Sequence, residues 1–185
     1  MIAFLRLLGI FNAALWLGAA LFFTFGVAPV FFQPAIKKLA GETQSGILAM
    51  LVLERYFLLN IICVTIAFLQ QLAEWVYLGR PLHRLTLILL ACLAGIGLIT
   101  EFGLQPKLQR LHQTKYAYTR TAQGYARNDA VTPQQRDAAK SSWPIWHGVS
   151  QATNLLVLAG IGLLLWRMAN RPEETRFVSA RQFRG

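Results

Sequence analysis

Four long stretches without a charged side chain divide the sequence. They cover residues 7–32, 56–73, 85–100 and 149–166. About 20 consecutive apolar residues are enough to cross a bilayer as an α-helix, and helices satisfy every backbone polar group in lipid. The pattern therefore predicts an all-α integral membrane four-helix bundle. We expect one transmembrane domain over 1–170, with helices at about 4–32, 46–72, 84–104 and 143–168.

The polar segment at 105–142 has its own pattern. A heptad spacing, typical of packed helices, joins Leu104, Leu108, Leu111, Lys115, Tyr118, Ala122 and Tyr125. It predicts that the third helix continues out of the membrane to about residue 127. A turn at 128–133 and a short returning helix at 134–142 would complete a helical hairpin that protrudes between the third and fourth helices. Because proline is tolerated in a first helical turn, Pro144 indicates where the fourth helix begins.

Composition and charge narrow the class of partner. The chain is 55% hydrophobic and 14% charged, with a formal net charge of +10, whereas soluble domains carry about 25% charged residues. Its Lys and Arg residues lie in loops and at helix ends, which is typical of contact with anionic lipid headgroups. We therefore expect the lipid bilayer as a partner and no nucleic acid. The basic tail at 171–185 is predicted to be flexible.

The first apolar run is longer than the core of a cleaved signal peptide, so we expect it to be retained as a helix. Four helices place both ends of the chain on one side of the membrane. With eight Lys and Arg residues on that side and ten on the other, charge bias does not decide the orientation. Arginines directly beside helix ends favour cytoplasmic termini. The prediction is a multi-pass membrane protein, located in the inner membrane if the source is prokaryotic.

Several polar side chains lie inside the apolar runs, where they cost free energy unless they are partnered. The candidate cluster consists of Glu54, Arg55, Glu101, His147, Ser150 and Asn154. Its titratable members are expected at one depth, in the leaflet beside 105–142, and no other titratable residue is expected within a span. An ion pair between Arg55 and Glu101 is plausible, with His147 bonded to Glu54 or Glu101.

Two interpretations of this cluster stay open. Its members could be hydrogen-bonded contacts between helices, or they could form a proton, metal or small-solute site that opens to one face. A single histidine is a weak metal site. Haem is not expected because only His147 lies inside a predicted span, whereas His83 and His112 lie in the connections outside the spans. Cys63 and Cys92 lie in separate runs and should behave as small apolar residues. We expect no enzymatic activity, no catalytic residue and no cofactor.

Local motifs add a family resemblance. They are Trp16 with Gly18, Arg55-Tyr56-Phe57, Glu101 followed by Gln105-Pro106-Lys107, and His147-Gly148-Val149-Ser150 with Asn154. Through them the chain resembles the transmembrane protein 205-like family, also catalogued as domain of unknown function 4149. The resemblance implies an integral membrane protein without an established reaction. It also implies an association with platinum-drug resistance, which suggests metal or drug handling, although this sequence has no CxxxC pair.

These observations lead to two functional hypotheses. In the first, the protein is a scaffold or accessory membrane subunit whose segment 105–142 binds a protein partner. In the second, it is a small transporter or a metal- or proton-handling protein that uses the intramembrane cluster. A redox protein is a third option, and the sequence also leaves a homo-oligomer open.

Overall fold

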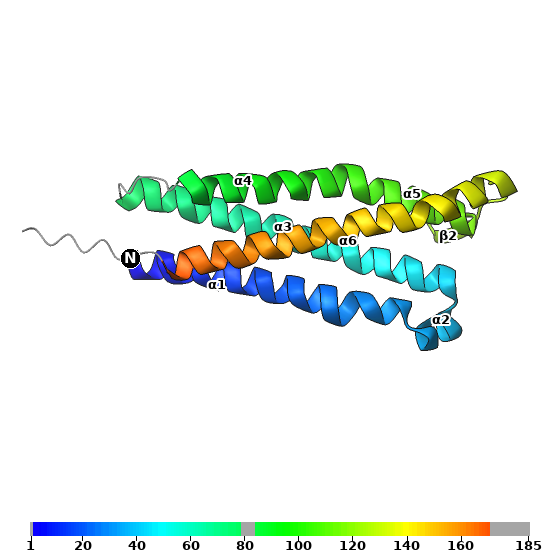
Figure 1. Cartoon of the computed structure of the whole chain (residues 1–185), viewed down its shortest axis with the longest axis horizontal. Coiled ribbons are helices and arrows are strands. Elements are labelled where there is room, and N and C mark those ends of the chain that lie inside the picture. The colour runs from blue at the N-terminus through cyan, green and yellow to red at the C-terminus, as the bar shows by residue number, and fades with distance from the viewer. Residues whose placement is uncertain (1, 79–83, 171–185) are drawn as a thin grey trace, which may run out of the picture.

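The structure is a computed structural model, and it describes residues 2–78 and 84–170 (Figure 1). The predicted flexible tail lies outside these residues. The described elements are α1 (Ile2–Leu21), the π-helical η1 (Phe22–Val27), the 3₁₀-helical η2 (Ala28–Phe32), α2 (Pro34–Ala40), α3 (Glu42–Leu78), α4 (Arg84–Ile99), the π-helical η3 (Thr100–Leu104), α5 (Gln105–Tyr116), β1 (Tyr118–Thr121), β2 (Gly124–Arg127) and α6 (Pro133–Ala169).

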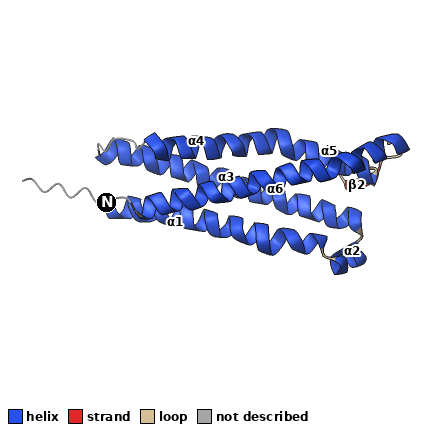
Figure 2. Cartoon of the chain, in the orientation of Figure 1, coloured by secondary structure: helices blue, strands red, loops and turns tan. Residues whose placement is uncertain are grey.

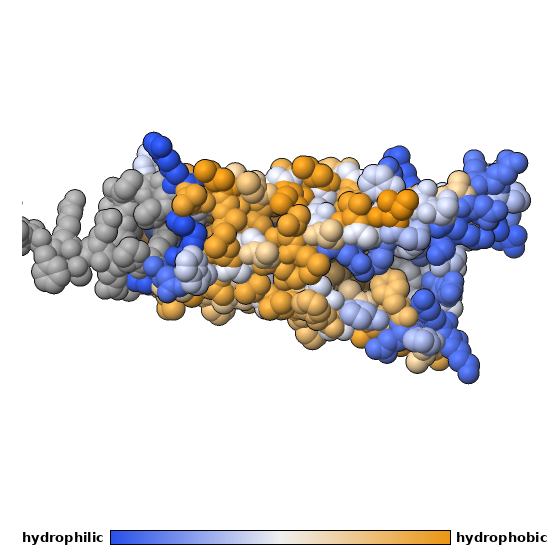
Figure 3. All heavy atoms as spheres, in the orientation of Figure 1, coloured by the Kyte–Doolittle hydropathy of each residue, from blue (hydrophilic) through white to orange (hydrophobic). Residues whose placement is uncertain are grey.

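The all-α four-helix bundle is confirmed. Among the described residues, four helical segments are long and apolar enough to cross a membrane: Phe4–Phe32, Glu42–Tyr77, Arg84–Tyr116 and Pro133–Ala169. Helices dominate the chain (Figure 2). On the face shown in Figure 3, a central apolar belt is flanked by polar ends, and polar side chains cover the end that carries α2, α5 and the β-strands. We call this end the hairpin end.

The core forms where α1 packs against α3 and α6, while α4 packs against α3 and α6 on the other side. Ala13, Ala20 and Ala67 are buried at these contacts, and small side chains allow transmembrane helices to approach closely. Cys63 is buried in this core as a free thiol, and Cys92 is a free thiol on the exposed surface of α4. Many other apolar side chains face outward, as a surface in contact with lipid requires.

Each of the two π-helical turns comes just before a proline. Pro29 follows η1, and Pro106 follows η3. A proline within a helix cannot donate a backbone hydrogen bond, and its ring clashes with the carbonyl four residues earlier. The wider π-helical turn shifts that carbonyl. Hydrogen bonds in these turns join residues five apart, from Ala28 N–H to Phe23 O and from Gln105 N–H to Thr100 O.

The prediction that the third helix reaches about residue 127 is wrong. Helix α5 ends at Tyr116, and Ala117 adopts a left-handed conformation with φ 50°. Strands β1 and β2 then pair antiparallel, with Tyr118 opposite Arg127. Tyr and Thr residues favour strands. Ala122 and Gln123 form the turn between the strands, and Gly124, the first residue of β2, leaves it at φ 129°. The heptad spacing beyond Lys115 therefore does not mark a helix.

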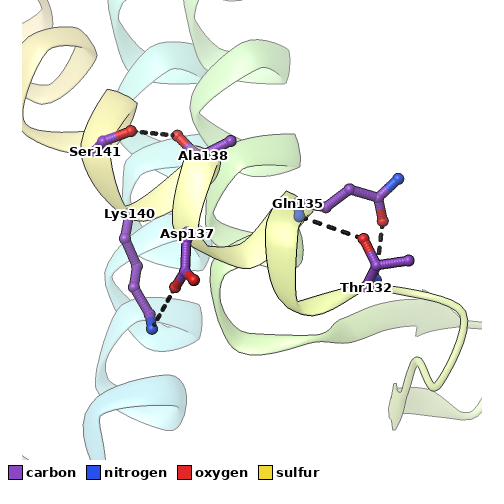
Figure 4. Close-up of polar contacts among 6 residues, drawn as sticks. All are labelled: Thr132, Gln135, Asp137, Ala138, Lys140 and Ser141. Carbon is purple, nitrogen blue, oxygen red and sulfur yellow. Dashed lines mark hydrogen bonds and ion pairs between the residues drawn. The ribbon is translucent and has the colours of Figure 1, made fainter.

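The predicted start of the fourth helix is also wrong. Helix α6 begins at Pro133 and runs through Pro144 without a break in its assignment. Thr132 caps it: Gln135 N–H donates to Thr132 Oγ1 at 3.3 Å, and Thr132 N–H donates to Gln135 Oε1 at 3.0 Å (Figure 4). This reciprocal capping box supplies the strong start signal. The arms between the two membrane segments are therefore α5 and the first part of α6, which pack together.

The start of α1 and the end of α6 lie together at the other end of the bundle (Figure 1). Arg6 Nη2 donates a hydrogen bond to the carbonyl oxygen of Ala169 at 3.2 Å. The described chain therefore begins and ends on the same side of the bundle, as an even number of crossings requires. We call this side the terminal end.

Candidate functional site

A cavity of about 1140 Å³ lies inside the hairpin end of the bundle. It forms where the helices diverge (Figure 1), between η1 and η2, α3, η3 with α5, and α6. Five of the six predicted cluster residues line it: Glu54, Glu101, His147, Ser150 and Asn154. Arg55 does not, because its side chain points outward and is exposed. We call this space the hairpin-end cavity.

The deep part of the cavity is tied together by amide side chains. Asn154 Nδ2 donates to Thr24 Oγ1 at 2.7 Å, and its Oδ1 accepts from Tyr56 Oη at 3.2 Å. Asn60 Oδ1 accepts from Trp16 Nε1 at 2.5 Å. These bonds join α1 to α3, and they join α6 to both η1 and α3. Asn154 therefore fits the interpretation of the cluster as contacts between helices, because its amide bridges η1 and α3.

The two carboxylates behave differently from the amides. Glu54 Oε1 pairs with Arg120 Nη1 of β1 at 3.2 Å. The expected ion pair between Arg55 and Glu101 is not present among the described contacts. Glu101 Oε2 is buried and has no hydrogen-bond partner in the described part of the chain. Glu54 is close enough to Glu101 to interact with it electrostatically. Glu101 is therefore the cluster member whose polar atom the fold leaves unsatisfied.

His147 lies on an aromatic wall of the cavity. Its ring is 5.6 Å from that of Phe32 and stacks 5.8 Å from that of Trp143. Its Nε2 is 3.2 Å from Nε2 of Gln151, its neighbour one turn along α6. The predicted hydrogen bond from His147 to Glu54 or Glu101 is therefore not present among the described contacts.

Sequence analysis missed His112. The sequence places it in the polar segment outside the predicted spans, but it lies in α5, is 3% exposed and lines the cavity. Its Nδ1 is 2.7 Å from the hydroxyl of Tyr118, and its ring contacts those of Tyr116 and Trp143. A spacing signal was present, because His112 follows Leu108 by four residues on the buried face of α5.

The floor of the cavity contains both π-helical turns. Thr24 belongs to η1 and Glu101 to η3, and both side chains line the cavity. Single π-helical turns inside α-helices occur frequently at functional sites. Here each one puts a polar side chain into the same space from a different transmembrane segment.

A second buried polar cluster lies toward the terminal end of α3. Gln70, Gln71 and Glu74 are at most 9% exposed. Gln70 Nε2 donates to Glu74 Oε1 at 2.5 Å, and the side chain of Gln70 fills the space over Gly9. The expectation that titratable residues within spans lie only at the hairpin end is therefore wrong. The predicted helix ended at 72, whereas α3 continues to Leu78.

No group of three or more His, Cys, Asp or Glu side chains is placed to hold a metal ion within residues 2–78 and 84–170. Among the cavity residues, the histidines and carboxylates are distributed over α3, η3, α5 and α6. A proposal of metal binding therefore has no support in the described geometry.

Comparison with known proteins places the chain by family. The model of one family, a domain of unknown function (DUF4149), matches residues 11–117. This match includes Glu54, Glu101 and His112 but not α6, so the His147 to Asn154 element lies outside it. Searches of the curated proteins and of the solved structures returned no match. Because the match covers more than half of the chain, this membrane protein belongs to the DUF4149 family.

Proposed function

We propose that the protein binds a small amphipathic molecule in the hairpin-end cavity, and that binding rather than catalysis is its activity. The observation that carries this proposal is the convergence of the two π-helical turns on one space, where Glu101 has a buried unpaired oxygen. Ligand pockets are mostly apolar with a few placed polar groups. This one has apolar walls, including Leu53, Phe57 and Leu93, around its polar members.

The cavity supports the second of the two functional hypotheses, a small transporter or solute-handling protein. An interhelical hydrogen bond in a membrane contributes on average about 0.6 kcal/mol. Structural contacts of that kind do not require an empty space between the helices. A cavity of about 1140 Å³ beside them does have a use in holding a molecule.

The test is to identify what the protein carries from native membranes. Protein purified in mild detergent is extracted, and the released small molecules are measured by mass spectrometry. Gly97 lines the cavity, and a Cβ added there would meet no atom within 4 Å. Gly97→Leu should therefore fill part of the cavity and displace a ligand without disturbing the helix.

Gly95→Leu is the matched control, because Gly95 lies on the same helix, also has open space at its Cβ, and does not line the cavity. We expect a molecule that is retained by the unaltered protein and by Gly95→Leu and is depleted in Gly97→Leu. The same extract from all three proteins would show that the cavity is not a binding site.

A scaffold or accessory role through 105–142 is the second candidate. Its support is charge, because this segment has seven Lys or Arg residues and two Asp residues, and several of them are exposed at the hairpin end. A protein partner with an acidic surface would fit. Reversing the exposed Arg110 and Lys140 to Glu should abolish co-purification of such a partner, whereas Gly97→Leu should not affect it.

The narrower placement in the transmembrane protein 205-like family is part of the same proposal. Its support is the element from His147 to Asn154, whose His147, Ser150 and Asn154 side chains line the cavity. If this element is a binding motif, Ser150→Ala should reduce ligand retention as Gly97→Leu does. Retention equal to that of the unaltered protein would remove this support.

A further inference from the structure

Of the carboxylates that line the hairpin-end cavity, two have a partner within the protein and one has an oxygen without a partner among the described residues. Glu54 pairs with Arg120, and Glu42 Oε2 accepts a hydrogen bond from Tyr116 at 3.3 Å. The remaining lining carboxylate, Glu101, has its Oε2 buried without a partner among the described residues. A buried carboxylate is costly unless it is hydrogen-bonded or paired with a positive charge. The polar group that the cavity lacks is therefore a donor or a cation.

The lining cations do not supply that charge. Lys115 Nζ lies 4.8 Å from the ring centre of Tyr116 and 5.7 Å from that of Trp143, at the hairpin-end rim. It interacts with the aromatic wall instead of with Glu101. Lys37, in the short helix α2, also lines the cavity, and no ion pair joins it to a carboxylate in the part of the chain that is described.

The aromatic wall shows what kind of group it tolerates. Phe32, His147, Trp143 and Tyr116 are in ring contact with one another or with His112. Faces of aromatic rings attract cations, most strongly where water is excluded. Tyr116 and Trp143 already hold the ammonium group of Lys115 in this way. The wall is thus suited to the charged end of an organic cation as well as to an apolar body.

We infer that the hairpin-end cavity selects lipophilic cations, with an ammonium group bound by Glu101 and an apolar body against the aromatic and aliphatic walls. This inference rests on the proposed function and names its ligand class. Glu101 is the residue that determines specificity, because the other lining carboxylates have partners within the protein. A neutral molecule of the same shape would keep the apolar contacts and lose the charge-assisted bond.

The experiment compares two probes that share one cage, 1-adamantylamine and 1-adamantanol. The full chain is reconstituted in phosphatidylcholine nanodiscs, and binding is measured by isothermal titration at pH 7, where the amine is cationic. Titration into protein-free nanodiscs corrects for partition into lipid. We expect the amine to bind at least about tenfold more tightly than the alcohol, a difference of about 1.4 kcal/mol.

Glu101→Gln keeps the shape and removes the charge, so it should weaken amine binding about tenfold and change alcohol binding less than about twofold. Asp137→Asn is the matched control, because it makes the same charge change on α6 outside the cavity. Equal binding of the two probes to the unaltered protein, or an equal loss in both variants, would overturn the inference.

The two proposals fail in different ways. If both probes bind equally and Gly97→Leu abolishes both, the cavity is a binding site without selection for cations. If the amine binds but Gly97→Leu leaves its affinity unchanged, the amine occupies another surface, and both the cation inference and the choice of cavity are wrong. Absence of amine binding contradicts the inference alone when native extraction still yields a molecule that Gly97→Leu displaces.

Discussion

His112 of α5 lies directly over Gly46 of α3, and a Cβ added at residue 46 would overlap its imidazole ring. The two residues join the start of α3 to α5, which otherwise make few contacts. Because His112 also bonds Tyr118 and contacts Trp143, its position couples the β-hairpin and α6 to α3. The absence of a side chain at Gly46 therefore allows α5 to pack against α3 at the hairpin-end cavity.

Gly46→Ala should separate α5 from α3. The added methyl group cannot fit without moving a buried ring, and overpacking of this kind costs about 1–3 kcal/mol. We expect a lower free energy of unfolding, measured by denaturation in mixed micelles. Gly148→Ala is the control, since its added Cβ would meet no atom within 4 Å. Equal stability of the two variants would mean that the ring moves without cost.

The ion pair between Glu54 and Arg120 should contribute little to stability. Its side chains are 34% and 52% exposed, and exposed pairs contribute about 0.2–1 kcal/mol because water and salt screen them. A double-mutant cycle with Glu54→Gln and Arg120→Gln should give a coupling energy in that range, decreasing as salt is added. A larger coupling that salt does not change would show that the pair is shielded from solvent.

The start of α6 should depend on the hydroxyl of Thr132. Removing an N-cap side chain typically costs about 1 kcal/mol, so Thr132→Ala should increase amide hydrogen exchange over residues 134–137. Thr132→Ser keeps the accepting oxygen and should preserve protection. If Thr132→Ala leaves exchange unchanged, the capping box does not determine where the helix begins.

Alkaline pH should act on the hairpin end through Tyr118. Burial, with further contributions from Tyr125 and Tyr116, raises the pKa of this tyrosine above its usual value. The folded state therefore holds the phenolic proton more tightly than the unfolded state. The corresponding stabilisation is complete below about pH 10 and is lost as pH rises above it.

Tyr118→Phe removes this titration, so its free energy of unfolding should fall less than that of the unaltered protein between pH 9 and 11. At pH 7 the variant should be less stable, because His112 Nδ1 loses its bond to the hydroxyl. Tyr77→Phe, at an exposed tyrosine near the terminal end of α3 and away from Tyr118, is the control. Parallel pH profiles for all three proteins would contradict the assignment to Tyr118.

The membrane-spanning architecture could be predicted because it depends on composition over long windows. Uncharged runs of the required length predict spans whatever their neighbours are. The first and last residues of the helices depend on local signals instead. The capping box of Thr132 and Gln135 marks the start of α6, but the prediction used Pro144. The strands at 118–127 were missed because an i, i+3, i+4 spacing can arise by chance in a short polar segment.

The depth of a residue along the bundle predicted its place in the site better than the direction of its side chain around the helix did. Glu54, Glu101 and His147 were placed at the same level of the bundle, and all three line the cavity. Arg55, next to Glu54, was included on depth alone and faces outward, since successive helical residues differ by about 100° around the axis. His112 lies beyond the predicted end of the third span and was left out, whereas α5 continues to Tyr116 and places it in the wall of the cavity.

The hydrogen bond between Arg6 and Ala169 brings the two ends of the described chain together. Reporter domains attached at either end of the protein must therefore enter the same compartment. A pair of fusions, one at each terminus, provides an internal check on orientation: agreement assigns the side of the hairpin-end cavity opposite to both reporters. Disagreement would require an odd number of crossings and would contradict the fold itself.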